Sequence, residues 1–271
     1  MKFRLKIWLH AGSLLLTSQL FSQQDNWDVY MARYEKGPGT TVVNMTIRKT
    51  APAVNFPFLF SAGVKFTNCT NDGLPVATEF DNLNRMSDSI VSAVNRLVKN
   101  ILVGTFTYQC ERRDYFYVPD TIGLRQQVID VLSKNFPNYI PAFNVKPDKD
   151  WAAYLEFLYP NEETMNYMQN EKVLIQLQKA GDKLEKERQV DHWIYFKTEA
   201  DRECFLLRAI QDHFKVESKT TEVALPLPFK LQISRIDKID QQTINAITLQ
   251  LRQEAKKCNG EYDGWETFVI K

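Results

Sequence analysis

The chain has 271 residues, of which 44% are hydrophobic and 25% charged, a composition typical of folded globular domains and not of disordered segments. Its formal net charge is +1, with 34 basic against 33 acidic residues, so it lacks the basic field that non-specific nucleic-acid binding requires. The length allows two domains of modest size.

The first 22 residues have the order of a secretory signal peptide. Three basic residues lie within the first six positions, an apolar core follows over 8–16, and Ser22 is a small residue suited to cleavage. The apolar core is shorter than the roughly 20 residues that span a bilayer. We therefore expect an exported, periplasmic or secreted protein without a stable membrane anchor. The alternative is an ordinary N-terminal helix of a cytosolic protein.

The first half, from residue 25 to 160, alternates segments typical of strands and of helices. Strand segments are rich in β-branched and aromatic residues and are bounded by turn residues, whereas helical segments repeat apolar residues every three to four positions. The expected strands are 27–34, 40–48, 58–66, 101–108 and 112–118, and the expected helices are 83–98 and 121–135. A turn at 35–39 joins the first two strands, and the segment 151–158 closes the unit. This order indicates an α/β sandwich.

Short motifs in this half point to a known family. It opens on Trp27-Asp28-Val29-Tyr30 and carries an Asn71-Asp72-Gly73-Leu74-Pro75 loop. The other matching positions are Glu79, 104–107, 115–117, 150–151, 154 and 159–160. On these motifs the half resembles the domain of unknown function 695 family, which has no assigned chemistry. The resemblance therefore implies no reaction or cofactor.

The second half, from residue 164 to 271, begins with a helix over 164–180 and a charged connector over 183–191. The segments that follow are predicted as a strand, a helix capped by Thr198, two strands, a helix and a final strand. They cover 192–196, 199–214, 215–223, 229–236, 240–258 and 262–270. The order βαββαβ is that of a ferredoxin-like domain, so the whole chain is predicted as an α+β protein of two domains.

The end of the chain carries the most particular string, Gly-Glu-Tyr-Asp-Gly-Trp-Glu over 260–266. Together with Gly181-Asp182 and the strand around Trp193, this string resembles the regulator of ribonuclease E activity B family. The resemblance implies a non-catalytic protein that binds an endoribonuclease and restrains it. Because ribonuclease E works in the cytoplasm, an exported chain is expected to bind another protein, whereas a cytoplasmic one would inhibit an endoribonuclease.

The string has two readings. As a partner-binding surface it would present Glu261, Tyr262, Asp263, Gly264, Trp265 and Glu266, because tryptophan is enriched at binding hot spots. As a structural segment it would use Gly260 as a left-handed helix cap, a conformation that Asn259 also tolerates, Asp263-Gly264 as a bulge or sharp bend, and Trp265 as a packed anchor. We expect the structural role to prevail for the tryptophan.

A second class of function is a small-ligand binder or an enzyme that uses the N-terminal half, with Asn71, Asp150, Trp151 and Tyr154 as the site. No nucleophile, nucleotide-binding or metal-binding motif occurs in the sequence, and we assign no catalytic residue, cofactor or metal. RNA binding is disfavoured because the expected outward positions of strand 229–236 are not aromatic.

The four cysteines, Cys69, Cys110, Cys204 and Cys258, have no zinc-binding spacing, and in an exported protein they could form two disulfides. In a ferredoxin-like domain the first helix starts at the end of the domain where the second helix finishes. Cys204 and Cys258 would then be close enough to bridge, with Cys69 and Cys110 as the companion pair. Buried free thiols are the alternative.

Overall fold

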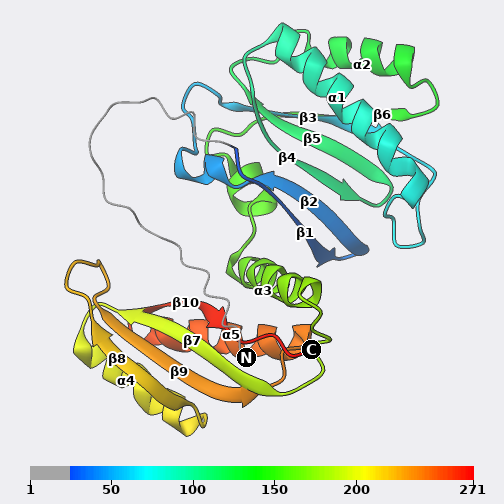
Figure 1. The fold of residues 1–271 in the computed structure, drawn as a ribbon. Helices are drawn as coiled ribbons and strands as arrows, with labels where there is room; N and C mark the ends of the chain where they lie inside the picture. Colours follow the sequence, from blue (N-terminus) through cyan, green and yellow to red (C-terminus); the bar gives the residue numbers. More distant parts are fainter. Residues whose placement is uncertain (1–24) are drawn as a thin grey trace. The chain divides into compact units, whose positions relative to one another are not determined.

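The computed structural model describes residues 25–271, which form two compact units divided between Thr164 and Met165. Each unit has its own sheet and its own helices (Figure 1). The architecture is α+β, as the sequence predicted. The expected signal peptide lies outside the described residues. Within the described part of the chain, no helix is both long and apolar enough to cross a membrane.

The N-terminal unit is built on a six-stranded antiparallel sheet with the strand order β1-β2-β4-β5-β3-β6. Its strands are β1 (Trp27–Tyr34), β2 (Gly37–Asn44), β3 (Phe58–Lys65), β4 (Ile101–Tyr108), β5 (Glu111–Val118) and β6 (Ile140–Pro147). Helices α1 (Phe80–Leu97) and α2 (Leu124–Asn135) cover one face of this sheet (Figure 1). The main core lies between that face and the two helices.

Two expectations for this unit are wrong. The second strand starts at Gly37 and not at residue 40, because the turn is only Glu35-Lys36, and a short 3-10 helix over Thr46–Lys49 replaces the expected end of the strand. The strand β6 was not expected at all. It carries Pro141 and Pro147, which weaken the sequence signal for a strand, and it lies at the sheet edge, where the missing N–H of proline costs least.

The C-terminal unit has the predicted order β7-α4-β8-β9-α5-β10, preceded by helix α3. The bounds are α3 (Glu162–Lys179), β7 (Arg188–Phe196), α4 (Glu199–Gln211), β8 (Lys215–Thr221), β9 (Phe229–Asp237), α5 (Gln241–Lys257) and β10 (Gly260–Glu266). The antiparallel sheet has the order β10-β7-β9-β8, the arrangement of a ferredoxin-like layer. Thr198 caps α4 as predicted, because its hydroxyl accepts from the Asp201 amide.

The strand β7 alternates between buried and half-buried positions along its length. Its buried residues, such as Ile194 and Phe196, join the core formed with α4 and α5. The strand is longer than expected because it begins at Arg188, inside the stretch predicted as a charged connector. Arg188 is buried and forms an ion pair with the buried carboxylate of Asp182, which allows these two charged side chains to lie inside the unit.

Candidate functional site

The C-terminal string forms β10, which lies at the edge of its sheet and pairs with β7 alone. The residue in the left-handed conformation before this strand is Asn259, with φ of 51°, the second of the two residues that the sequence suggested, and not Gly260. Gly260 is needed for a different reason. A Cβ atom there would lie 2.4 Å from Cε1 of Phe196, so the strand can approach β7 only with glycine at this position.

A bulge interrupts the pairing of β10 with β7 between Tyr262 and Gly264, where the sequence predicted a bulge or bend. Tyr262 pairs with Ile194, whereas Gly264 pairs with Trp193, so Asp263 is the additional residue. The bulge lets two aromatic side chains three positions apart, those of residues 262 and 265, both face the core.

Trp265 is a packing residue with only 9% of its surface exposed. It belongs to a cluster with Leu174, Val190 and Ile244, and its indole Nε1 donates a hydrogen bond of 2.8 Å to Oδ1 of Asn170 on α3. Burial with a satisfied N–H is the usual state of a structural tryptophan. Trp265 therefore holds β10 against α3 and α5.

Tyr262 is the second inward-facing aromatic residue of the string. Its hydroxyl lies 2.8 Å from Nδ1 of His192, and both residues are buried. Burial raises the pKa of Tyr262 well above its ordinary value and, with a contribution from Arg235, lowers the pKa of His192 to about 3. Both groups are therefore neutral at physiological pH, which suits a hydrogen-bonded pair in the core and gives no poised acid or base.

The exposed part of the string consists of Glu261 and Asp263, while Gly264 and Glu266 are half-buried. Glu261 and Asp263 border a surface hollow of about 420 Å³. The other lining residues are Gln169, Tyr195, Leu225, Pro226, Leu227, Arg252 and Tyr262. The hollow thus combines two exposed carboxylates, one guanidinium, an aromatic ring from the outer face of the sheet and an apolar loop.

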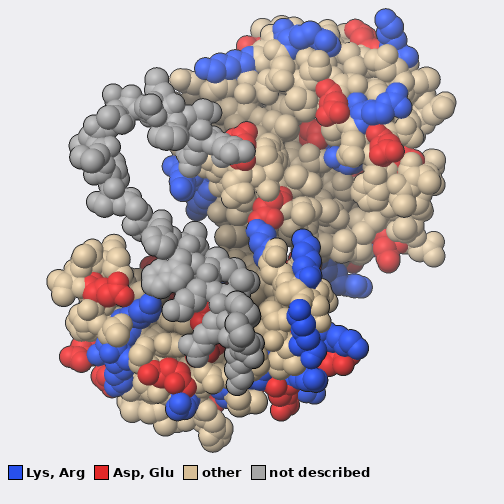
Figure 2. Space-filling view, in the orientation of Figure 1, with Lys and Arg blue, Asp and Glu red and all other residues tan. Residues whose placement is uncertain are grey.

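Arg252 of α5 is held beside this hollow by contacts with Tyr262 and Gln169. Its guanidinium lies 5.3 Å from the Tyr262 ring centroid, and one nitrogen donates to Oε1 of Gln169 at 3.2 Å. Lys230 lies 5.5 Å from the ring centroid of Tyr195 in a similar way. In the view of Figure 2, basic and acidic side chains are interspersed over the surface, with no field of one sign.

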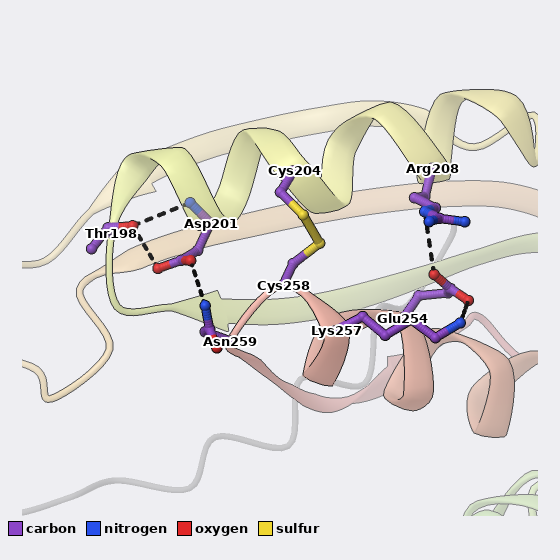
Figure 3. Close-up of a disulfide and its surroundings, with 8 residues drawn as sticks. All are labelled: Thr198, Asp201, Cys204, Arg208, Glu254, Lys257, Cys258 and Asn259. Carbon is purple, nitrogen blue, oxygen red and sulfur yellow. Dashed lines mark hydrogen bonds and ion pairs between the residues drawn. A yellow bond between two sulfur atoms is a disulfide. The ribbon is translucent and has the colours of Figure 1, made fainter.

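A disulfide fixes the start of β10 to α4 (Figure 3). It joins Cys204 on α4 to Cys258, which follows α5, with Cα atoms 5.8 Å apart. The polar contacts along the same seam join Asn259 Nδ2 to Asp201 Oδ1 at 2.9 Å, and Arg208 to Glu254 at 3.5 Å. The hydrogen bond from Asn259 is the main cause that lowers the pKa of Asp201. The disulfide and these contacts therefore fix the start of β10, the strand that carries the exposed carboxylates of Glu261 and Asp263.

The four residues proposed as a ligand site in the N-terminal unit do not form one site. Trp151 is fully buried and stacks on Tyr117, with ring centroids 3.9 Å apart, and Tyr154 is fully buried and donates to the carbonyl of Asn44. Asp150 is exposed. Asn71 is exposed in a loop that is joined to the opposite end of β5 by the disulfide between Cys69 and Cys110.

Tyr195, Arg252 and the loop Leu225–Leu227 were missed in the sequence analysis. The alternation along β7 could have identified Tyr195 as an outward position. No pattern places Arg252 or the loop beside β10, because these segments meet only in the folded unit. Among the described residues, no group of three or more His, Cys, Asp or Glu residues is placed to hold a metal ion.

Comparison with known proteins agrees with the motifs of both halves. Residues 25–159 match a family of unknown function, DUF695, and residues 168–267 match the family described as regulator of ribonuclease activity B. The chain resembles two families, one in each half. No curated protein matches it. The crystal structure of an unknown protein from Galdieria sulphuraria aligns with 79% of this chain and 98% of its own at 7% identity, with a TM-score of 0.21, which is too low to support an argument.

Proposed function

We propose that this chain is an exported, non-catalytic regulatory protein whose C-terminal unit binds another protein through β10 and the adjacent hollow. The observation that carries the proposal is that buried and exposed residues alternate along the first part of β10. Tyr262 and Trp265 are buried and hold the strand, whereas Glu261 and Asp263 are exposed beside an aromatic ring and an apolar loop. A mixed acidic, aromatic and apolar surface is typical of a protein-binding site.

The position of β10 supports the same proposal. An edge strand leaves backbone N–H and C=O groups available, and a partner segment can pair with them. The two carboxylates next to that edge favour a partner with basic side chains, and the hollow of about 420 Å³ has room for one large side chain. We therefore expect a basic, extended partner segment.

Family and compartment together limit which partner this is. Regulators of ribonuclease activity B are non-catalytic and bind ribonuclease E, so a protein partner is expected for this chain also. The two disulfides favour an oxidising compartment, in which that enzyme is absent. We propose an envelope or extracellular partner, and inhibition of an endoribonuclease is the alternative if the native chain is cytoplasmic.

The localisation is tested by the N-terminal sequence and the cell fraction of the native protein. A chain that begins near Gln23 outside the cytoplasm supports the exported role. An intact Met1 in the cytoplasmic fraction contradicts it and makes ribonuclease regulation the leading function.

The interface is tested by photo-crosslinking with a benzoyl-phenylalanine placed at position 261 or 263, and at exposed Gln211 at the end of α4 as a control. We expect positions 261 and 263 to capture one and the same protein and position 211 not to. With that protein purified, Glu261→Lys plus Asp263→Lys should weaken binding at least about tenfold. Equal capture from position 211, or unchanged affinity of the double variant, contradicts the proposed interface.

A further inference from the structure

The N-terminal unit contains a polar pocket that is separate from the residues considered above. It has a volume of about 340 Å³ and lies where the segment after β3, the start of α1 and the loop after α2 meet. Its lining residues are Thr67, Asn68, Glu79, Asn82, Arg85, Asn135, Phe136, Pro137, Asn138 and Tyr139. The volume is in the range of small-molecule sites.

The most informative group in this pocket is the carboxylate of Glu79, which directly precedes α1 and is only 4% exposed. Oε1 accepts a hydrogen bond of 2.6 Å from the Tyr139 hydroxyl, and Oε2 accepts one of 3.1 Å from Nδ2 of Asn68. Burial and the hydrogen bond to Glu79 raise the pKa of Tyr139, so the phenol keeps the proton that it donates.

Both of these donors to Glu79 are neutral, and they leave part of its acceptor capacity unused. An ionised carboxylate offers about four lone-pair sites, of which two are occupied here. A buried carboxylate is stabilised most by a cation that also donates hydrogen bonds, because burial removes its hydration. A ligand ammonium group would meet both requirements.

The second charge of the pocket is Arg85 of α1, which lies on the same helix face as Asn82, three residues earlier. Its guanidinium lies 5.8 Å from the centroid of the buried Phe136 ring, which orients it at the rim of the pocket. A guanidinium held in this way recognises a carboxylate through two parallel hydrogen bonds.

We propose that this pocket binds a small zwitterion of the free amino-acid class, with its ammonium group at Glu79 and its carboxylate at Arg85. Three of the lining asparagines, Asn82, Asn135 and Asn138, have side-chain amides that can donate hydrogen bonds to the rest of the ligand and accept them from it. The proposal does not rest on the protein-binding role of the C-terminal unit, because every residue involved belongs to the N-terminal unit.

The test is calorimetric titration of the chain from residue 25 to 271 with the twenty standard amino acids, their N-acetyl forms, their amides, and glucose as an uncharged polar control. We expect at least one free amino acid to bind, and acetylation or amidation to weaken that binding about tenfold or more, because each removes one charge-assisted contact. Equal binding of the blocked forms, binding of glucose alone, or no binding at millimolar concentration overturns the proposal.

Variants then locate the site. Arg85→Gln should lower the affinity for the best amino acid about tenfold. The matched control is Arg96→Gln, which removes the same charge from an exposed position of α1 outside the pocket and should leave the affinity unchanged. Glu79→Gln should also weaken binding, with near-ultraviolet circular dichroism as a check on folding. Because Arg85 is exposed, its substitution is expected to preserve the fold, and equal effects of the two arginine variants overturn the assignment.

Discussion

One interior strand from each unit, β3 and β7, shows that the two sheets are covered differently. In the N-terminal unit β3 is buried at six consecutive positions, from Leu59 to Val64, whereas β7 of the C-terminal unit alternates between buried and half-buried positions. The first pattern is typical of a strand with material on both faces, and the second of a strand with one face open.

This difference separates the kinds of site that the two units offer. In the N-terminal unit the second face near β5 is filled by Trp151, Tyr154 and the short π-helix Ala153–Leu158, and the ligand site that we propose lies elsewhere, in the pocket beside Glu79. In the C-terminal unit the half-buried Trp193 and Tyr195 belong to an open sheet face, next to the edge strand. We infer that the first unit suits a small molecule and the second a macromolecule.

The largest expected effect is on packing in the covered unit. Trp151→Ala removes a fully buried ring stacked on Tyr117 and a hydrogen bond from its Nε1 to the carbonyl of Phe56, and should lower the free energy of unfolding by about 3–5 kcal/mol. Trp27→Ala, at a position 39% exposed in the same unit, should cost less than about 1 kcal/mol. Hydrogen exchange measured peptide by peptide should show that protection is lost in β3 and β5 alone.

The matching pair in the C-terminal unit tests the difference between its two sheet faces. Trp265→Ala should cost about 3–5 kcal/mol because it leaves a cavity and removes the hydrogen bond to Oδ1 of Asn170, whereas Trp193→Ala on the open face should cost about 1 kcal/mol or less. Urea unfolding followed by resonances of β9 is the measurement. Comparable costs for the two substitutions would contradict the assignment of an open face, and an unaffected Trp265→Ala variant would restore that residue as an interface residue.

Disulfides should affect the two units equally. Replacing Cys69 and Cys110 by alanine, or Cys204 and Cys258, should cost about 2–5 kcal/mol in the unit concerned. The bridged cysteines are 41 and 54 residues apart, and chain-entropy arguments for loops of these lengths give costs that differ by only about 0.2 kcal/mol. The measurement is unit-resolved urea unfolding, with peptide mapping without reduction to show that native material is bridged. Free thiols in exported protein would contradict both the bridges and the prediction.

The smallest effect for a single step is the change in stability over one pH unit, and its sign should differ between the units. The pKa of His192 is lowered to about 3 from 6.5, so below about pH 6.5 the unfolded chain binds a proton that the folded unit does not. The free energy of unfolding of the C-terminal unit should therefore fall as the pH is lowered, by at most about 1.4 kcal/mol per pH unit, until about pH 3.

In the N-terminal unit burial raises the pKa of Asp114, although Thr105, Arg112 and Ser87 lower it in part. A carboxyl with a raised pKa contributes stability below its unfolded pKa and loses that contribution as the pH rises through the folded value. Its contribution thus favours this unit at acid pH. The measurement is the urea midpoint of each unit, followed by NMR resonances of that unit, between about pH 4 and 7. If the stability of the C-terminal unit falls as much with pH in a His192→Phe variant as in the native chain, a group other than His192 is responsible.

Local sequence patterns were sufficient for most of the fold. The βαββαβ order, the Thr198 cap and the bulge at Asp263-Gly264 were predicted because each depends on neighbouring residues: apolar periodicity, a hydroxyl before a helix, and a glycine within a strand. The edge strand β6 was missed because its two prolines oppose the strand signal, and only pairing with β3 overrides it.

The sites depended on contacts between distant segments. The sequence by itself determined that Trp151, Tyr154 and Trp265 are important aromatic positions, but composition cannot separate an interior aromatic from a binding one. In the folded units all three are buried. Folding also brings Glu79 next to Tyr139, 60 residues away, and Tyr195 next to the loop Leu225–Leu227. The physical reason is that local propensity acts over a few residues, whereas the charge and shape of a site come from segments that meet only through tertiary packing.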